Sequence, residues 1–365
     1  MEPDRGDRQG TTAGVTEAFL AHRPFLRALA YRLLGSWHDA EDVLQDAFVR
    51  WSRADRTDVD EPRRYLTRVV TRLAVDRLRA RAREAYVGPW LPEPVATDPS
   101  PFGTVDTSDL SIAVLHLMER LTPPQRAVYV LRTAFGVDYP EIARIVGRPP
   151  EHCRQLHHRA AEALSGHPRF SADRAETSRL VDAFAAAARR GDLSALERLL
   201  HTDVEAWSDG GGRVRAALRP VLGVRKVARL FAAVYRRPRA FTASPVEVNG
   251  QPGLVVGYVT RTHVLTVAVT DGLISRVYLV ADPVKLRPFL TQRHQPDQQP
   301  DQVEAGRRPG TVRDRVDRQP DRAGEVQELI GDARADPLRG QQPVGQQQGA
   351  RAHPADDLDD HGSSA

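Results

Sequence analysis

Arginines recur on one side of the segment from Glu61 to Glu84, whose sequence is EPRRYLTRVVTRLAVDRLRARARE. At about 100° per residue of a helix, the apolar side chains fall on the opposite side. Guanidinium groups bind phosphates with charge and forked hydrogen bonds, and an aromatic ring can stack on an unpaired base. A solvated basic face on a core helix is the alternative, and this segment alone does not exclude it. The stripe consists of Arg64, Arg68, Arg72, Arg79 and Arg83, with Tyr65 at its edge.

Three aspartates share one arc of the preceding segment, HDAEDVLQDAFVRWSR, with three- and four-residue spacing. Its apolar residues share another arc, so the pattern predicts an amphipathic helix with an acidic face. Such a face suits a basic partner, although acidic residues also favour a helix N-terminus without any partner. Ser36 is placed to cap this helix. The aspartates are Asp39, Asp42 and Asp46.

A helix-turn-helix pattern follows in DYPEIARIVGRPPEHCRQLHHRAAEAL, with its turn at Gly147. Cys153 lies on the apolar stripe of the second helix and is expected to be a core residue. His157 and His158 lack further ligands at metal spacing, so we expect no metal site. The opposite face carries side chains that can contact base edges and phosphates: Arg148, Glu151, Arg154, Gln155, His158 and Arg159.

The remaining chain divides by composition into further segments. Residues 171–290 begin with helical patterns and end in alternating strands, with hairpin signals at Asn249-Gly250 and Asp271-Gly272. This order predicts an α+β domain. Residues 1–14 and 291–365 have too little apolar surface to offset chain entropy, so we expect both to be disordered. The candidate polar groups of this domain are Glu205, Asp209, His263 and Asp271, and they show no general base with an orienting partner at a recognisable spacing. The pattern therefore favours a small-molecule pocket over a catalytic site.

Composition limits where the protein works. The 52 Lys and Arg outnumber the 48 Asp and Glu only slightly, but the basic residues concentrate in the arginine-rich segment. The single cysteine excludes an internal disulfide framework and fits a reducing compartment. There is no apolar run near 18 residues and no signal-peptide core, so we expect a cytoplasmic protein without a membrane segment.

The order DAEDVLQDAFVRW, polar loop, EPRRYLTRVVTRLAVDRLR resembles region 2 of bacterial extracytoplasmic-function sigma factors, which form group 4 of their class, and the helix-turn-helix resembles their region 4. The resemblance implies an alternative sigma factor that binds core RNA polymerase through its β′ clamp helices and its β subunit. Asp39, Asp42 and Asp46 would bind polymerase. The arginine-rich helix would open the −10 promoter element, and the helix-turn-helix would recognise the −35 element, although Pro149 and Pro150 replace the usual cap. The implied −10 set is Arg64, Tyr65, Arg68, Arg72 and Arg79.

Three further motifs resemble those of the subgroup that carries a fused SnoaL-like cone domain. They are WLPEP at Trp90–Pro94, DGGGR at Asp209–Arg213 with arginine for lysine, and the partial match DPVKL at Asp282–Leu286. This resemblance implies regulation in cis by the C-terminal domain, without a separate anti-sigma factor. The implied contact residues are Trp90, Leu91, Pro92, Asp209, Gly210, Gly211, Gly212 and Lys285.

We therefore predict a multidomain protein with two all-α helical sigma domains, an α+β cone domain and a disordered tail. The segments are 1–14 disordered, 15–86 region 2, 87–110 linker, 111–166 region 4, 171–290 SnoaL-like domain and 291–365 tail. We expect no enzyme activity, metal or cofactor. The alternatives are a helix-turn-helix regulator that acts without polymerase, and a cone-fold enzyme or ligand sensor tethered to DNA. Promoter sequence, inducing signal and oligomeric state do not follow from the sequence.

Overall fold

The structure, a computed structural model, describes residues 12–54, 61–107, 109–165, 173–235, 242–258 and 261–293. Helices α1 to α3 form the first group. Gly35, at φ +64°, ends α1, and the Ser36 hydroxyl caps α2 by accepting from the Asp39 amide at 3.1 Å. The three helices bury one apolar side each against the others, as the helical spacing predicts. Their bounds are α1 Thr12–Leu34, α2 Trp37–Arg53 and α3 Pro62–Arg81.

The second group contains the helix-turn-helix. Thr122 and Gln125 form a capping box at the start of α5, and Asp138 caps α6 through the Glu141 amide at 2.8 Å. Gly147 has φ +68°, a left-handed conformation that ends α6 and that glycine adopts without strain. The bounds are α4 Ile112–Leu117, a 3-10 turn at Met118–Arg120, α5 Pro123–Thr133, α6 Tyr139–Val146 and α7 Pro150–Ser165.

The C-terminal domain is a six-stranded sheet in the order β2-β1-β6-β5-β4-β3. Strands β1 and β6 are parallel, and the other neighbours are antiparallel. Asn249 and Asp271 both have positive φ in the hairpin turns that the sequence predicts. The bounds are α8 Arg174–Arg190, α9 Leu193–Leu199, β1 Leu200–Asp209, β2 Val221–Leu222, α10 Val224–Tyr235, β3 Thr242–Val248, β4 Gln251–Tyr258, β5 Arg261–Thr270, β6 Leu273–Val280 and α11 Pro283–Arg293.

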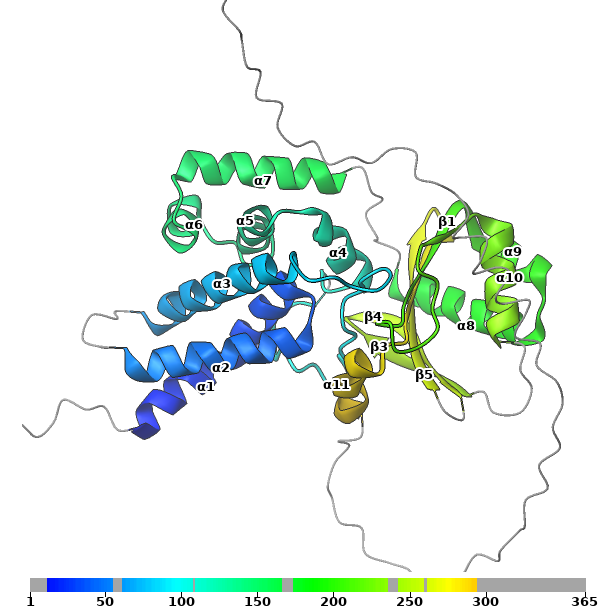
Figure 1. The fold of residues 1–365 in the computed structure, drawn as a ribbon, viewed down its shortest axis with the longest axis horizontal. Coiled ribbons are helices and arrows are strands. Elements are labelled where there is room, and N and C mark those ends of the chain that lie inside the picture. The colour runs from blue at the N-terminus through cyan, green and yellow to red at the C-terminus, as the bar shows by residue number, and fades with distance from the viewer. Residues whose placement is uncertain are drawn as a thin grey trace, which may run out of the picture.

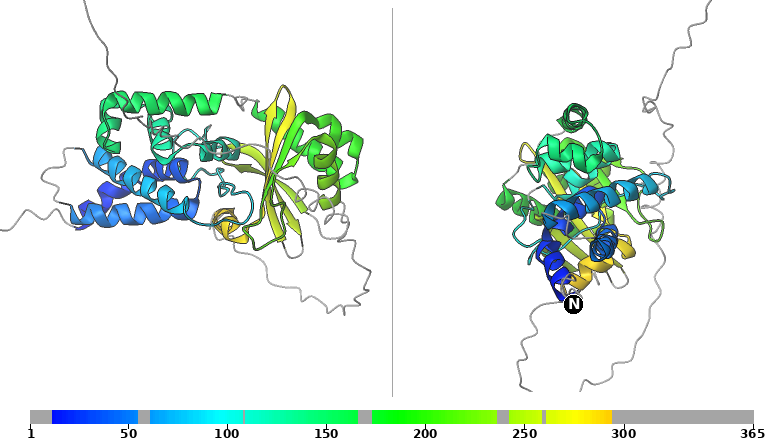
Figure 2. Two further views of the ribbon diagram at one scale, coloured as in Figure 1. Left: turned by 45° about the horizontal axis from the view of Figure 1, so that its top comes forward. Right: turned by 90° about the vertical axis from the view of Figure 1, so that its left-hand side faces the viewer.

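The two faces of this sheet are covered by different parts of the chain (Figure 1). Helices α8 to α10 cover one face with a core of their own domain. The other face meets α4, α11 and the segment that follows α3, as Figure 2 shows from a second direction. Leu91 and Ile112 share a buried cluster there with Tyr278 and Phe289. The helical groups and the C-terminal domain are thus packed together by apolar burial.

Most of the predicted organisation is confirmed: helical domains come first and an α+β domain follows. The prediction of disorder is wrong at both edges. Helix α1 begins at Thr12, inside the stretch 1–14, and α11 continues to Arg293, beyond residue 290. Residues 1–11 and 294–365 lie outside the described residues.

Candidate nucleic-acid interface and linker clamp

Helix α3 presents part of its arginine stripe to solvent. Arg64 and Arg68 are exposed, and the Arg68 guanidinium carbon lies 5.6 Å from the centroid of the Tyr65 ring. Tyr65 is half-buried because its ring packs against Trp51 at 5.7 Å. Arg79 is exposed and pairs with Asp76 on its own helix at 3.0 Å. These side chains are available to a nucleic acid that approaches α3.

Arg72 is placed differently from the rest of the stripe. Its Nε donates to the carbonyl of Ile145 at 3.0 Å, and its Nη2 donates to the carbonyl of Arg144 at 3.2 Å. Both carbonyls belong to the C-terminal turn of α6, where a cation is favourable. Arg72 therefore joins the helix expected to contact the −10 element to the helix-turn-helix.

The acidic face of α2 is also divided. Asp42 and Asp46 are exposed, whereas Asp39 is half-buried and pairs with Arg77 of α3 at 2.6 Å. Asp42 also lies near Arg77, at the longer distance of 3.9 Å. The hydrogen bond from Arg77 to Asp39 raises the pKa of Arg77. Beside Asp42, a cavity of about 410 Å³ between α1 and α2 is lined by apolar side chains such as Leu20 and Phe48 and by charged ones such as Arg23. Asp42 thus borders a surface that combines charge with apolar contact area, and Asp46 lies one turn further along α2.

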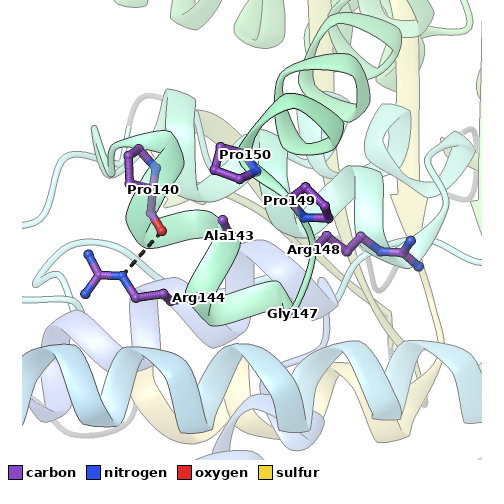
Figure 3. Close-up of a pocket in the computed structure, with 7 residues that line it drawn as sticks. All are labelled: Pro140, Ala143, Arg144, Gly147, Arg148, Pro149 and Pro150. Carbon is purple, nitrogen blue, oxygen red and sulfur yellow. Dashed lines mark hydrogen bonds between the residues drawn. The ribbon is translucent and has the colours of Figure 1, made fainter.

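All six residues predicted for −35 recognition are exposed. The turn ahead of α7 is shaped by Pro149 and Pro150, and Arg144 and Arg148 extend to opposite sides of it (Figure 3). Cys153 is fully buried, as expected. His157 packs at 5.8 Å on the ring of Tyr129, so its neighbour His158 is the histidine that faces solvent. The exposed residues are Arg148, Glu151, Arg154, Gln155, His158 and Arg159.

The segment after α3 is held by a buried carboxylate of the C-terminal domain. Asp209 accepts hydrogen bonds from the Tyr86 hydroxyl at 2.6 Å and from the Leu91 amide at 2.8 Å. Lys285 donates to Asp209 at 2.7 Å and to the Leu91 carbonyl at 2.6 Å. Only 1% of Asp209 and 5% of Lys285 is exposed. We call Tyr86, Leu91, Asp209 and Lys285 the linker clamp.

Trp90 lies between two cations from different domains. The Arg81 guanidinium of α3 is 4.1 Å from its ring centroid, and the Lys285 ammonium of α11 is 4.2 Å away. Burial lowers the pKa of Lys285, while the Asp209 carboxylate opposes this effect. Burial and the hydrogen bond to Asp209 both raise the pKa of Tyr86. Leu91, Asp209 and Lys285 thus form a water-poor junction of both domains, and the partly exposed Tyr86 lies at its edge.

The glycines of the DGGGR turn are required by close approach. Gly211 has φ +58°, and a Cβ there would lie 2.1 Å from an Asp282 oxygen. At Gly210, a Cβ would lie 2.2 Å from the Val214 carbonyl oxygen. Gly212 faces Val87 of the linker. Pro92 is buried beside Leu91. The structure thus brings together the residues predicted from the three motifs.

A second junction was not predicted as a contact. The Asn249 side chain accepts from the Val95 amide at 2.9 Å, and its own amide donates to the Val95 carbonyl at 2.9 Å. Its side-chain amide also donates to the Tyr31 hydroxyl at 2.6 Å and to the Leu110 carbonyl at 2.9 Å. The Asn-Gly pair was identified only as a hairpin turn, and nothing local indicates that its side chain enters another domain.

The polar groups considered for a pocket in the cone domain do not converge. Asp209 belongs to the linker clamp, and Glu205 accepts from Trp207 at 2.9 Å and from Arg276 at 3.3 Å. Burial lowers the pKa of His263 to about 4. Asp271 occupies a turn. Within the described residues no group of three or more His, Cys, Asp or Glu could hold a metal ion, and no helix there is long and apolar enough to cross a membrane.

Two family models match the helical part of the chain: Sigma-70 region 2 over residues 18–84 and Sigma-70 region 4 over residues 111–164. With the folds and surfaces described above, these matches define an RNA polymerase sigma factor. The ECF RNA polymerase sigma factor SigJ of Mycobacterium tuberculosis is 36% identical over 300 residues, which are 76% of this chain and 96% of SigJ. The chain belongs to the extracytoplasmic-function sigma factors, in the subgroup with a SnoaL-like C-terminal domain. It is thus an alternative sigma factor that directs transcription initiation, a non-enzymatic role, with core RNA polymerase and promoter DNA as partners.

Other relatives agree with this assignment. A probable ECF sigma factor, SigI of M. tuberculosis, is 32% identical over 289 residues and covers 76% of this chain and 97% of its own length. The crystal structure of SigJ superposes with a TM-score of 0.61 and 31% identity, and covers 75% of this chain and 98% of SigJ. The sigma factor RpoE of Bartonella quintana, solved in complex with the anti-sigma factor NepR, is 23% identical with a TM-score of 0.33 over 42% of this chain and 96% of its own, a likeness that adds nothing to the assignment.

Proposed function

We propose that α2 binds the β′ clamp helices of core polymerase through Asp42 and Asp46. Both carboxylates are exposed, and Asp42 lies beside a cavity that contains apolar side chains. Asp39, which we also predicted for this role, is bound to Arg77 and would contribute by fixing α2 against α3. The β subunit is the second proposed contact on core polymerase.

Promoter contacts are proposed for α3 and α7. On α3, Arg64, Tyr65, Arg68, Arg72 and Arg79 would meet the melted −10 strand, where stacking and phosphate neutralisation favour single-stranded DNA. Arg72 must first leave the carbonyls of α6. On α7 the exposed side chains would meet the −35 element in the major groove. Their set is Arg148, Glu151, Arg154, Gln155, His158 and Arg159. The proposed domains are 15–86 and 111–166, joined by the linker 87–110.

The C-terminal domain, 171–290, is proposed to regulate the sigma domains in cis. One observation carries this proposal. Asp209 and Lys285, a buried ion pair of that domain, bind the backbone amide and the backbone carbonyl of Leu91, respectively. Moving the linker requires breaking the hydrogen bonds of Leu91 to this pair. We therefore infer a docked and a released state of the linker. The domain would bias how far apart the two DNA-binding parts lie.

Two further expectations belong to the same proposal. The C-terminal domain acts without catalysis, because two of its candidate polar groups, Glu205 and Asp209, are engaged in a local contact and in the linker clamp. The protein works in the cytoplasm, where its partners are.

Run-off transcription with purified core polymerase tests the proposal. The double variant Asp42→Asn/Asp46→Asn should lose at least tenfold in polymerase affinity and transcript yield, since two charges are removed without a change in shape. Binding of the same variant to −35 duplex DNA should stay unchanged. Glu197→Gln, on the exposed surface of α9, is the matched control.

A variant that keeps full polymerase affinity would refute the proposed role of α2. Transcript yield that responds neither to Trp90→Ala nor to loss of the Asp209 side chain would refute regulation through the linker.

A further inference from the structure

Glu93 of the linker occupies the N-terminus of α2, although the two are far apart in sequence. Its Oε2 accepts from the backbone amides of Trp37 at 2.9 Å and His38 at 3.2 Å. The same oxygen lies 2.9 Å from His38 Nδ1, and Oε1 accepts from the Ser36 hydroxyl at 2.9 Å. Only 6% of Glu93 is exposed. A buried carboxylate from outside the helix therefore binds its first amides and complements its dipole.

The helix's own cap does not duplicate these bonds. The Ser36 hydroxyl accepts a hydrogen bond from the Asp39 amide. Glu93 accepts from the two preceding amides of the helix, those of Trp37 and His38. Without Glu93, the amides of Trp37 and His38 would lose their carboxylate partner at a half-buried helix N-terminus. The first turn of α2 therefore depends on where the linker lies.

The C-terminal domain fixes Glu93 from both sides. Two residues before it, Leu91 is held by the linker clamp, and two residues after it, Val95 is bracketed by Asn249. The Tyr31 hydroxyl accepts from Asn249 and donates to the Glu93 carbonyl, which completes a buried chain. Asn249 itself is fully buried.

The linker backbone leaves little slack between these contacts. Pro92 and Pro94 flank Glu93 and fix their own φ. The Glu93 amide donates to the Gly35 carbonyl at 2.8 Å. Displacing Val95 or Leu91 would thus move Glu93 as well, because the intervening prolines cannot absorb the change freely.

We propose that Glu93 is a positioning residue that couples the C-terminal domain to the polymerase-docking helix α2. The inference rests on the proposed role of α2 in polymerase binding. The C-terminal domain then has a supporting task besides setting the distance between the DNA-binding parts. By seating Glu93, it orders the first turn of α2 and orients the aspartates that follow.

The test uses full-length Glu93→Gln, which keeps the size of the side chain and removes its charge. Amide hydrogen exchange at Trp37 and His38 should become about tenfold faster, the effect of losing a helix-capping interaction. Affinity for core polymerase should fall about fivefold to tenfold, while binding to −35 duplex DNA stays unchanged. Glu84→Gln, an exposed glutamate after α3, is the control.

Asn249→Ala provides the second arm, because Asn249 acts on Glu93 only through Val95 and Tyr31. It should accelerate exchange at Trp37 and His38 as Glu93→Gln does, and the double variant should add nothing. If Glu93→Gln fails to fold, this arm decides alone.

Three results would overturn the coupling. The first is an unchanged exchange rate at Trp37 and His38 in Asn249→Ala. The second is a Glu93→Gln protein that binds polymerase within twofold of the parent, while Asp42→Asn/Asp46→Asn loses binding. In that case the docking role of α2 stands, and only the role of Glu93 is excluded. If Asp42→Asn/Asp46→Asn also binds like the parent, the docking role fails and the inference falls with it.

Discussion

At the scale of single residues, the linker clamp depends on one buried charge pair. Lys285 has its ammonium group in a water-poor site, 2.7 Å from Asp209. Breaking such a pair by removing one partner is costly because the other charge stays buried, whereas replacing both with apolar groups is often tolerated. We therefore expect the pair to contribute more to the specificity of the clamp than to net stability.

We expect Asp209→Asn to lower the free energy of unfolding of the C-terminal domain by about 3 to 5 kcal/mol, because the Lys285 ammonium would lose its counter-charge. Urea unfolding of the full chain, followed by tryptophan fluorescence, measures this. The double variant Asp209→Asn/Lys285→Met should recover most of the loss, and a double-mutant cycle gives the coupling. A loss below about 1 kcal/mol would mean that water reaches the pair.

At the scale of elements, α4 joins the second helical group to the sheet through a histidine. His116 packs at 4.6 Å on the ring of Trp207 and at 5.6 Å on that of Tyr278. Burial lowers the pKa of His116 to about 4; Arg276 and Arg120 act in the same direction, against Glu119 and a hydrogen bond with the Trp90 backbone. The packed state therefore holds a neutral imidazole.

This packing should weaken as the pH falls from about 6.5 to about 4. The histidine of a separated α4 takes up a proton near its ordinary pKa of about 6.5, while the packed histidine does so only near 4, so acid favours separation. From pH 7 to pH 5 the free energy of unfolding should fall by about 2 kcal/mol from His116 alone. His263 has a lowered pKa too, so the measured quantity is the difference between the parent and His116→Phe. Identical pH slopes in both proteins would contradict the expectation.

The elements also show what the sequence could predict. Helices α1 to α3 and α5 to α7 follow from apolar spacing and caps, because those are local signals. The sequence did not predict helix α11, because Pro288 inside it argues against a helix and its residues lack a clear amphipathic pattern. Strand β2 has two residues, too few for alternation. The contact residues of the C-terminal motifs were predicted from the resemblance to a known family. The contacts of Glu93 and Asn249 could be found only in the structure, because each residue binds a partner more than 50 residues away in the sequence.

At the scale of the whole molecule, the two DNA-binding parts are packed against each other. Besides Arg72, Arg81 of α3 pairs with Glu119 at 2.9 Å, and Glu119 also pairs with the buried Arg126 of α5. Helix α3 therefore touches the second helical group near its middle, at Arg72, and at its C-terminal end, at Arg81. The proposed promoter contact of Arg72 and its hydrogen bonds to α6 exclude each other, since the same guanidinium serves both.

Arg72→Ala should accordingly open the free protein. The bonds from Arg72 to the carbonyls of Ile145 and Arg144 join a charged donor to a helix C-terminus and are worth about 1.5 to 3 kcal/mol. Their loss should lengthen the distance between α2 and α7. Single-molecule energy transfer measures this distance between dyes attached at Val49→Cys and Glu162→Cys, in a Cys153→Ala background.

Arg68→Ala is the matched control, because Arg68 packs over Tyr65 of its own helix. Both variants should weaken −10 binding, but only Arg72→Ala should change the distance. An unchanged distance in Arg72→Ala would show that apolar packing alone holds the two parts together, and Arg72 would then be free to meet the promoter without any opening.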